Sequence, residues 1–188
     1  MKKTVLIFGS ISGAISSLMM AVMIPFVGRI GFDRAEIFGY TIIVVSMLLV
    51  YAGIRSYRDN AGGGIITFRQ AFGIGLLITV VSCLCYVAVW EVLYFNVGSM
   101  HQFMDKYAAY MVDKAKASGA SPEAIQAQIR EMAKFKDLYE NPLFNAAMTF
   151  TEPFPVGVIM SLISALILKK KETQEPVGQS SSRDVLTN

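Results

Sequence analysis

The chain has 188 residues, of which 54% are hydrophobic and only 16% are charged, against roughly 25% charged residues in a typical soluble domain. With a mean hydropathy of +0.49, its polar side chains are too few to cover a soluble globule, so lipid must cover part of the surface. The net charge of +3 lies mostly beside apolar stretches, which argues against nucleic-acid binding.

Four stretches are apolar and long enough to cross a membrane, for which about 20 helical residues suffice. We predict membrane spans over residues 4–28, 37–54, 70–95 and 143–168. The first follows Lys2 and Lys3 as in a signal peptide, but its apolar run is far longer than the roughly 7–15 residues typical of one. We therefore interpret it as an uncleaved anchor, joined to the second span by a short loop over residues 29–36.

The first span carries a row of small residues, Gly9, Gly13 and Ser17, spaced four apart. Such a row lets two helix backbones approach closely and lets a serine hydroxyl hydrogen-bond across the interface. We expect these residues to pack against another helix, within the bundle or between protomers, rather than to bind a ligand.

A glycine-rich connection, residues 57–69, separates the second and third spans. A phosphate-binding loop would continue into Gly-Lys-Ser or Gly-Lys-Thr, and this segment does not. It predicts a flexible turn and a short interfacial piece before the third helix. The side chains of Arg55, Arg58 and Arg69 would then contact anionic lipid headgroups.

Two carboxylates, Glu91 and Glu152, lie in or beside the apolar spans, where ionisable residues are rare and point to functional sites. The helix rise places both near the outer boundary of the hydrocarbon layer. One interpretation is a shared acidic site for a proton or a cation, which His101 could join as a proton carrier. The other, which we favour, is two separate interfacial carboxylates and a solvated histidine.

Residues 100–141, between the third and fourth spans, are more polar than the spans. Apolar residues recur there at helical spacing in two stripes, Phe103, Tyr107, Tyr110 and Met111, and Ile125, Ile129, Met132, Phe135 and Tyr139. Ser121 and Pro122 are typical of a helix start, and Asn141 followed by Pro142 of a helix end. The segment predicts an αα-hairpin of two amphipathic helices whose stripes face each other or the membrane.

The distribution of Lys and Arg predicts the orientation of the spans. A cytoplasmic N-terminus makes the cytoplasmic side net positive and the other side net negative, so we predict that both termini are cytoplasmic and the hairpin is extracytoplasmic. Residues 1–171 would form a single membrane domain. Residues 172–188 are polar and aperiodic, which predicts a disordered cytoplasmic tail.

The residues that usually carry metal or covalent chemistry are scarce. One histidine, His101, and two cysteines, Cys83 and Cys85, cannot build a tetrahedral zinc site or an iron–sulfur cluster without carboxylates. The sequence offers no serine–histidine or cysteine–histidine pairing with an orienting group. We therefore expect no metal, no cofactor and no enzymatic activity.

Several motifs together are similar to those of a known family. They are GIRSYR at residues 53–58, GGGIITF at 62–68, QAFGIG at 70–75, EPFPVG at 152–157 and SLISA at 161–165. With them, residues 2–171 resemble a family of small bacterial integral membrane proteins catalogued only as a domain of unknown function. The resemblance implies four spans with an external helical segment before the last. It implies no activity, because the family has no established catalytic or binding residues.

The sequence thus predicts an all-α, four-span protein of the bacterial inner membrane. Our leading interpretation is a non-enzymatic interaction or structural protein that acts through its external hairpin. The alternative is a small transporter or channel subunit that uses Glu91 and Glu152 and, having only four spans, requires an oligomer. The expected partners are the lipid bilayer and a second copy of the chain or another membrane protein.

Overall fold

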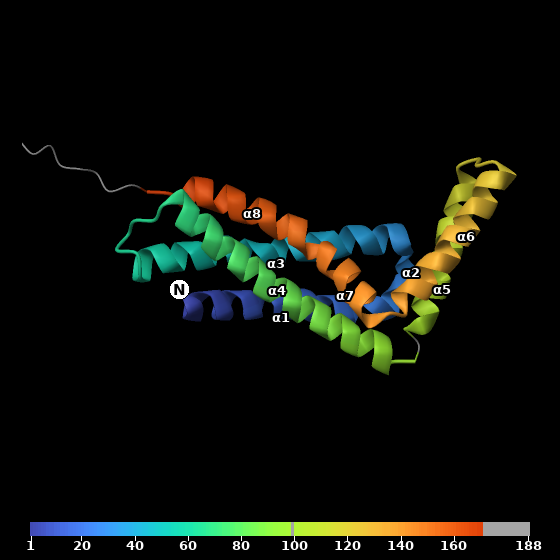
Figure 1. Cartoon of the computed structure of the whole chain (residues 1–188), viewed down its shortest axis with the longest axis horizontal. Helices are drawn as coiled ribbons and strands as arrows, with labels where there is room; N and C mark the ends of the chain where they lie inside the picture. Colours follow the sequence, from blue (N-terminus) through green and yellow to red (C-terminus); the bar gives the residue numbers. More distant parts are fainter. Residues whose placement is uncertain (99, 171–188) are drawn as a thin grey trace, which may run out of the picture.

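The computed structural model describes residues 1–98 and 100–170, and its regular elements are all helices (Figure 1). In chain order they are α1 (Lys2–Met23), the 3-10 turn η1 (Ile24–Phe26), α2 (Val27–Ile30), α3 (Phe32–Asn60), α4 (Phe68–Asn96), α5 (His101–Ala117), α6 (Pro122–Tyr139), α7 (Pro142–Thr151) and α8 (Pro153–Leu168). The predicted all-α fold is confirmed. The tail, residues 172–188, and Lys171 lie outside the described residues.

Four helical stretches are long and apolar enough to cross a membrane, as predicted. They are Lys2–Ile30, Phe32–Asn60, Phe68–Asn96 and Pro142–Leu168. By length and composition the chain is therefore a multi-pass membrane protein. The first two helical stretches are longer than the uncharged runs that predicted them, because charged residues such as Lys2 and Arg58 continue a helix beyond the apolar run.

The predicted loop over residues 29–36 is wrong. Arg29 and Ile30 complete α2, and α3 begins at Phe32, so Gly31 alone joins the two helices. Gly31 has a φ of +84°, a conformation that side-chain-bearing residues rarely adopt. A single glycine can therefore reverse the chain where the sequence had indicated several loop residues.

The long helices α1, α3, α4 and α8 run side by side, and α5 and α6 stand across the bundle axis at one end (Figure 1). α1 and α8 each pack against both α3 and α4. The N-terminus and the α3–α4 connection lie at the opposite end from the hairpin, and so does Lys170, which pairs with Ile66 of that connection. We call these the hairpin end and the terminal end of the bundle.

The centre of the bundle buries aliphatic side chains, among them Met47, Val50, Ile54 and Ile78, which are fully buried. Many other large apolar side chains are exposed, such as Leu6, Leu48, Val92 and Ile167. Since a lipid environment accepts apolar surface, these exposed side chains fit a membrane location.

The α3–α4 connection is more ordered than the flexible turn that the sequence predicted. Ile66 and Lys170 exchange two backbone hydrogen bonds, with N···O distances of 3.2 and 2.9 Å. Thr67 then begins α4 in a capping box: its hydroxyl accepts from the Gln70 N–H, and the Gln70 side chain accepts from the Thr67 N–H. The end of the fourth span thereby holds the start of the third.

The fourth span is broken at Glu152, between α7 and α8. Pro153 and Pro155 have no N–H to donate, so the regular helical hydrogen bonds stop there. Beyond the break the two halves have different neighbours: α8 packs against α3 and α4, whereas α7 packs mainly against α4, α6 and α8. The break therefore directs α7 away from α3.

Candidate functional site

A cavity of about 690 Å³ lies at the hairpin end, between the spans and the hairpin. Its walls come from every helical element from α1 to α7. Most of the lining is aromatic or methionine: Phe32, Tyr40, Tyr86, Trp90, Phe103, Tyr107, Tyr110, Phe135, Tyr139, Met20, Met23, Met104, Met111 and Met148. Because α7 diverges from α3 at the proline break, the cavity has room between these two helices.

Glu152 stands at the break and lines the cavity. Its Oε2 accepts a hydrogen bond of 3.1 Å from the Tyr86 hydroxyl on α4. Glu36 of α3 lines the cavity as well. Neither carboxylate forms an ion pair within the described residues.

A buried polar network holds one wall in place. Asn145 of α7 is fully buried; its Oδ1 accepts from the Trp90 indole N–H at 2.8 Å, and its Nδ2 donates to the Tyr139 carbonyl at 3.1 Å. Thr149 adds a third hydrogen bond, of 3.3 Å, to the same Asn145 oxygen. Satisfied networks of this kind rigidify their surroundings, so the ring of Trp90 and the backbone at Tyr139 are held in place. Burial raises the pKa of Tyr139 to about 12.

The hairpin is anchored to the start of α3. The ring of Phe32 stacks on Tyr110 at 5.0 Å and meets Phe103 and Tyr107 edge-on, each at 5.6 Å between centroids. Tyr110 and Lys114 both donate hydrogen bonds to Asp33 Oδ1. The hydrogen bond to Asp33 raises the pKa of the Lys114 ammonium, which therefore keeps its charge. Part of the first predicted stripe thus faces α3 instead of α6.

A second contact anchors the other side of the hairpin: the Tyr94 hydroxyl donates to Glu140 Oε1 at 2.9 Å. Within the hairpin, Lys136 of α6 pairs with Asp105 of α5. The hairpin is therefore tied both to the bundle and within itself at the base that covers the cavity.

Glu91 and Glu152 occupy different surroundings. Glu91 follows Tyr86 by five residues, which turns it about 140° around α4 from the tyrosine that contacts Glu152. Glu152 lines the cavity and Glu91 does not. Among the described residues, Glu91 Oε1 is buried and has no hydrogen-bond partner. His101 is the first residue of α5, and its side chain lies outside the described part of the structure.

The small residues of α1 lie against α4. A Cβ added to Gly9 would come within 2.7 Å of the Val81 side chain, and one added to Gly13 within 2.5 Å of Cys85 Cβ. Ser17 is buried, and its hydroxyl donates to the Gly13 carbonyl at 2.6 Å. These residues therefore set how closely α1 approaches α4.

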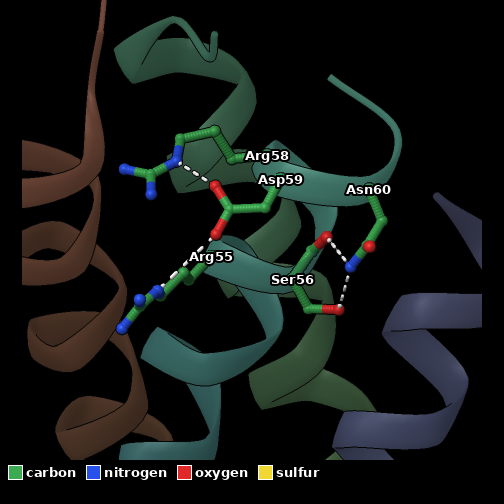
Figure 2. Close-up of polar contacts among 5 residues, drawn as sticks. All are labelled: Arg55, Ser56, Arg58, Asp59 and Asn60. Atoms are coloured by element: carbon green, nitrogen blue, oxygen red, sulfur yellow. Dashed lines mark hydrogen bonds and ion pairs between the residues drawn. The ribbon is translucent and has the colours of Figure 1, made fainter. Parts of the chain in front are cut away.

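Arg55 and Arg58 lie in the last turns of α3 and Arg69 lies in the first turn of α4, so all three are at the terminal end of the bundle. Figure 2 shows Asp59 between two of them: the Arg58 Nε lies 2.7 Å from Asp59 Oδ1, and the Arg55 Nε lies 3.6 Å from Oδ2. Arg69, at the start of α4, is exposed. Among the described residues, no three His, Cys, Asp or Glu side chains lie close enough together to hold a metal ion.

The sequence did not point to Tyr86, Glu36 or Asn145. Asn145 left a faint signal, since it is an amide in an apolar run, one turn before Thr149. Tyr86 and Glu36 gave no such signal, because the local sequence does not indicate which helix each side chain will contact.

Comparison with known proteins gives a family and no activity. A family model described as a protein of unknown function, DUF4199, matches residues 7–170. No curated protein and no solved structure matches the chain. Because the family match spans most of the chain, the resemblance stated from the sequence is confirmed, and the protein belongs to the DUF4199 family of unknown function.

Proposed function

We propose that this chain is a non-enzymatic protein of the bacterial inner membrane, with cytoplasmic termini, that acts through its extracytoplasmic hairpin. The hairpin covers a cavity in which a small amphipathic molecule binds. The observation that carries the proposal is the shared lining: Phe103, Tyr107 and Tyr139 of the hairpin and Tyr40, Tyr86 and Trp90 of the spans surround the same space.

The size and chemistry of the cavity support ligand binding. Its volume of about 690 Å³ falls in the range of roughly 300–1,000 Å³ that is usual for small-molecule sites. Its walls are mainly apolar with a few polar groups such as Glu152, the pattern typical of such sites. Because the hairpin supplies part of the walls, occupancy and hairpin position would be coupled.

The hairpin also presents a surface for partners. Ile129 and Leu138 of α6 are 41% and 52% exposed. We propose that this surface contacts the lipid bilayer, a second copy of the chain or another membrane protein. Ligand binding would change the position of the hairpin and thereby its contact with that partner. Nucleic acid is not among the proposed partners.

The single tryptophan of the chain, Trp90, allows the covering role to be tested. It is 8% exposed and lines the cavity. In detergent-solubilised full-length protein, the double variant Phe32→Ala, Asp33→Asn should loosen the hairpin and increase the quenching of Trp90 fluorescence by acrylamide. Lys116→Gln is the matched control, because Lys116 pairs with Asp113 inside α5. The proposal fails if hydrogen exchange shows a detached hairpin while Trp90 quenching is unchanged.

The alternative, an oligomeric transporter or channel subunit that uses Glu91 and Glu152, draws on two observations. Glu152 lines a cavity, and Glu91 has a buried carboxylate oxygen that no described residue hydrogen-bonds. It predicts that Glu91→Gln and Glu152→Gln each abolish pH-dependent cation movement into proteoliposomes. Unchanged cation uptake in either variant would exclude the transporter alternative.

A further inference from the structure

The charges around the cavity are unbalanced. Three charged residues line it, Glu36, Glu152 and Lys114. The charge of Lys114 is offset by Asp33, whose Oδ1 lies 2.8 Å from the Lys114 Nζ. Glu36 and Glu152 have no basic partner within the described residues, so the cavity is net negative.

Glu36 and Glu152 line the same cavity. Tyr107 of α5 has a raised pKa, first because of its burial; the charges of Glu36 and, to a smaller extent, Glu152 also raise it, whereas the charge of Lys114 lowers it. Glu36 comes from α3 and Glu152 from the α7–α8 break, so they approach this ring from different elements. A positive charge beside Tyr107 would therefore interact with both.

The aromatic walls favour a cation over a neutral molecule. The faces of Trp, Tyr and Phe rings carry negative potential and attract cations within about 6 Å. The lining includes rings from α3, α4, α5 and α6, and methionine sulfurs such as that of Met104 add polarisable contacts. A bare metal ion would not fill this volume, and it prefers several oxygen ligands to aromatic rings.

The cavity continues toward the lipid-facing surface. The cavity adjoins the open outer face of α3, because Glu36 and Tyr40 line the cavity and also belong to this face. Other residues of the face include Ile37, Val44 and Val45. Ile37 is 67% exposed, as expected of a side chain that faces lipid. A ligand that enters past this face must dissolve in the bilayer.

We propose that the cavity binds a lipophilic organic cation, with its positive charge between Glu36 and Glu152 and its apolar body against the aromatic and methionine walls. The molecule enters from the bilayer past the open outer face of α3. This assignment rests on the proposed function of the cavity as a ligand site, and it adds the chemical class of the ligand.

Two ions of nearly equal shape and opposite charge test the proposal. Full-length protein in phosphatidylcholine nanodiscs is titrated with tetraphenylphosphonium and separately with tetraphenylborate. Bound ion is measured by equilibrium dialysis against empty nanodiscs, and Trp90 fluorescence reports occupancy of the cavity. We expect saturable binding of the phosphonium with a change in Trp90 emission, and no saturable binding of the borate.

Variants locate the site. Glu152→Gln and Glu36→Gln should each weaken phosphonium binding at least about tenfold, since each removes one of the two carboxylates that attract the cation. Glu36 is exposed on α3, so its substitution leaves the fold intact. Glu91→Gln is the matched control: it removes a carboxylate from the same end of the bundle but outside the cavity. Equal loss in Glu91→Gln, or no loss in either cavity variant, would overturn the assignment.

The two ions also separate this inference from the proposed function. Equal saturable binding of both ions would overturn the cation assignment and leave the cavity as a ligand site. Binding of neither ion, with Trp90 emission unchanged, would overturn the cation assignment and also count against the cavity as a ligand site.

Discussion

Single residues decide how closely the spans approach one another. Gly13 faces Cys85, and Gly157 faces Thr79, whose Cγ2 would lie 2.1 Å from an added Cβ. Where the helices approach closely, serine and threonine hydroxyls form hydrogen bonds between them, such as the 3.1 Å hydrogen bond between Ser82 and Ser12. Small residues thus serve packing on both sides of α4, as is usual in membrane bundles.

Gly13→Ala should destabilise the protein by about 1–3 kcal/mol, because the new methyl group collides with Cys85 Cβ and the Ser82 carbonyl. The control is Gly73→Ala, also in a helix, where among the described residues no atom outside its own turn of helix lies within 4 Å of the added Cβ. There the better helix propensity of alanine should leave stability equal or higher. Thermal unfolding in detergent measures both, and equal loss in the two variants would contradict the close contact of α1 with α4.

Tyr139 predicts a pH dependence. Its pKa is about 12 in the folded protein against 10.0 for a free tyrosine, because the side chain is buried. Its protonated hydroxyl therefore contributes stability in full below pH 10, and this contribution is lost as the pH rises toward 12. Tyr139→Phe should show a smaller fall in melting temperature between pH 9 and pH 11.5 than the wild type. Parallel curves for the two proteins would exclude this role.

At the scale of elements, the break at Glu152 and the docking of the hairpin create the cavity together. The break turns α7 away from α3, and aromatic rings of α5 pack against Phe32 at the start of α3. The hairpin is therefore held by its aromatic side, while parts of α6 remain exposed.

This arrangement predicts different results for two similar substitutions. Tyr107→Asp should displace the hairpin from α3, because it puts a charge into the ring cluster around Phe32. Ile129→Asp should have little effect, since Ile129 is 41% exposed. Hydrogen exchange over residues 101–139, with α1, α3, α4 and α8 as internal references, distinguishes them. A strong effect of Ile129→Asp alone would show that α6 has a covering partner.

At the scale of the whole molecule, the two ends of the bundle differ. The terminal end has the N-terminus, Arg55, Arg58 and the pairing of Ile66 with Lys170, and the other end has the hairpin and the cavity. The net positive terminal end fits the cytoplasmic side of a membrane.

The orientation can be tested with reporter fusions. Fusions after Asn60 and after Lys170 should report a cytoplasmic location, and fusions within residues 114–130 an external one. Fusions in the hairpin and after Asn60 that report the same side would contradict the topology, because α4 separates the two positions.

The sequence by itself determined the four spans, their order and the family. Hydropathy over about 20 residues is a local property, and the bilayer imposes the helix on any such stretch because backbone groups have no other partners there. The capping residues Ser121 and Pro122 likewise marked the start of α6 correctly. The turn at Gly31 was not predicted, because a single glycine can connect two helices only when those helices pack against each other in a suitable orientation.

The tertiary structure alone decided which residues share a site. The sequence placed Glu91 and Glu152 at similar depth, which left a shared site and two separate carboxylates as interpretations and favoured the second. The rotation of α4 gives Glu152 the contact with Tyr86 and leaves Glu91 outside the cavity. The packing of the helices also brings Glu36 into the same lining, from a helix remote in the sequence. Depth follows from residue spacing within one helix, whereas the facing of side chains depends on how several helices turn and pack against one another.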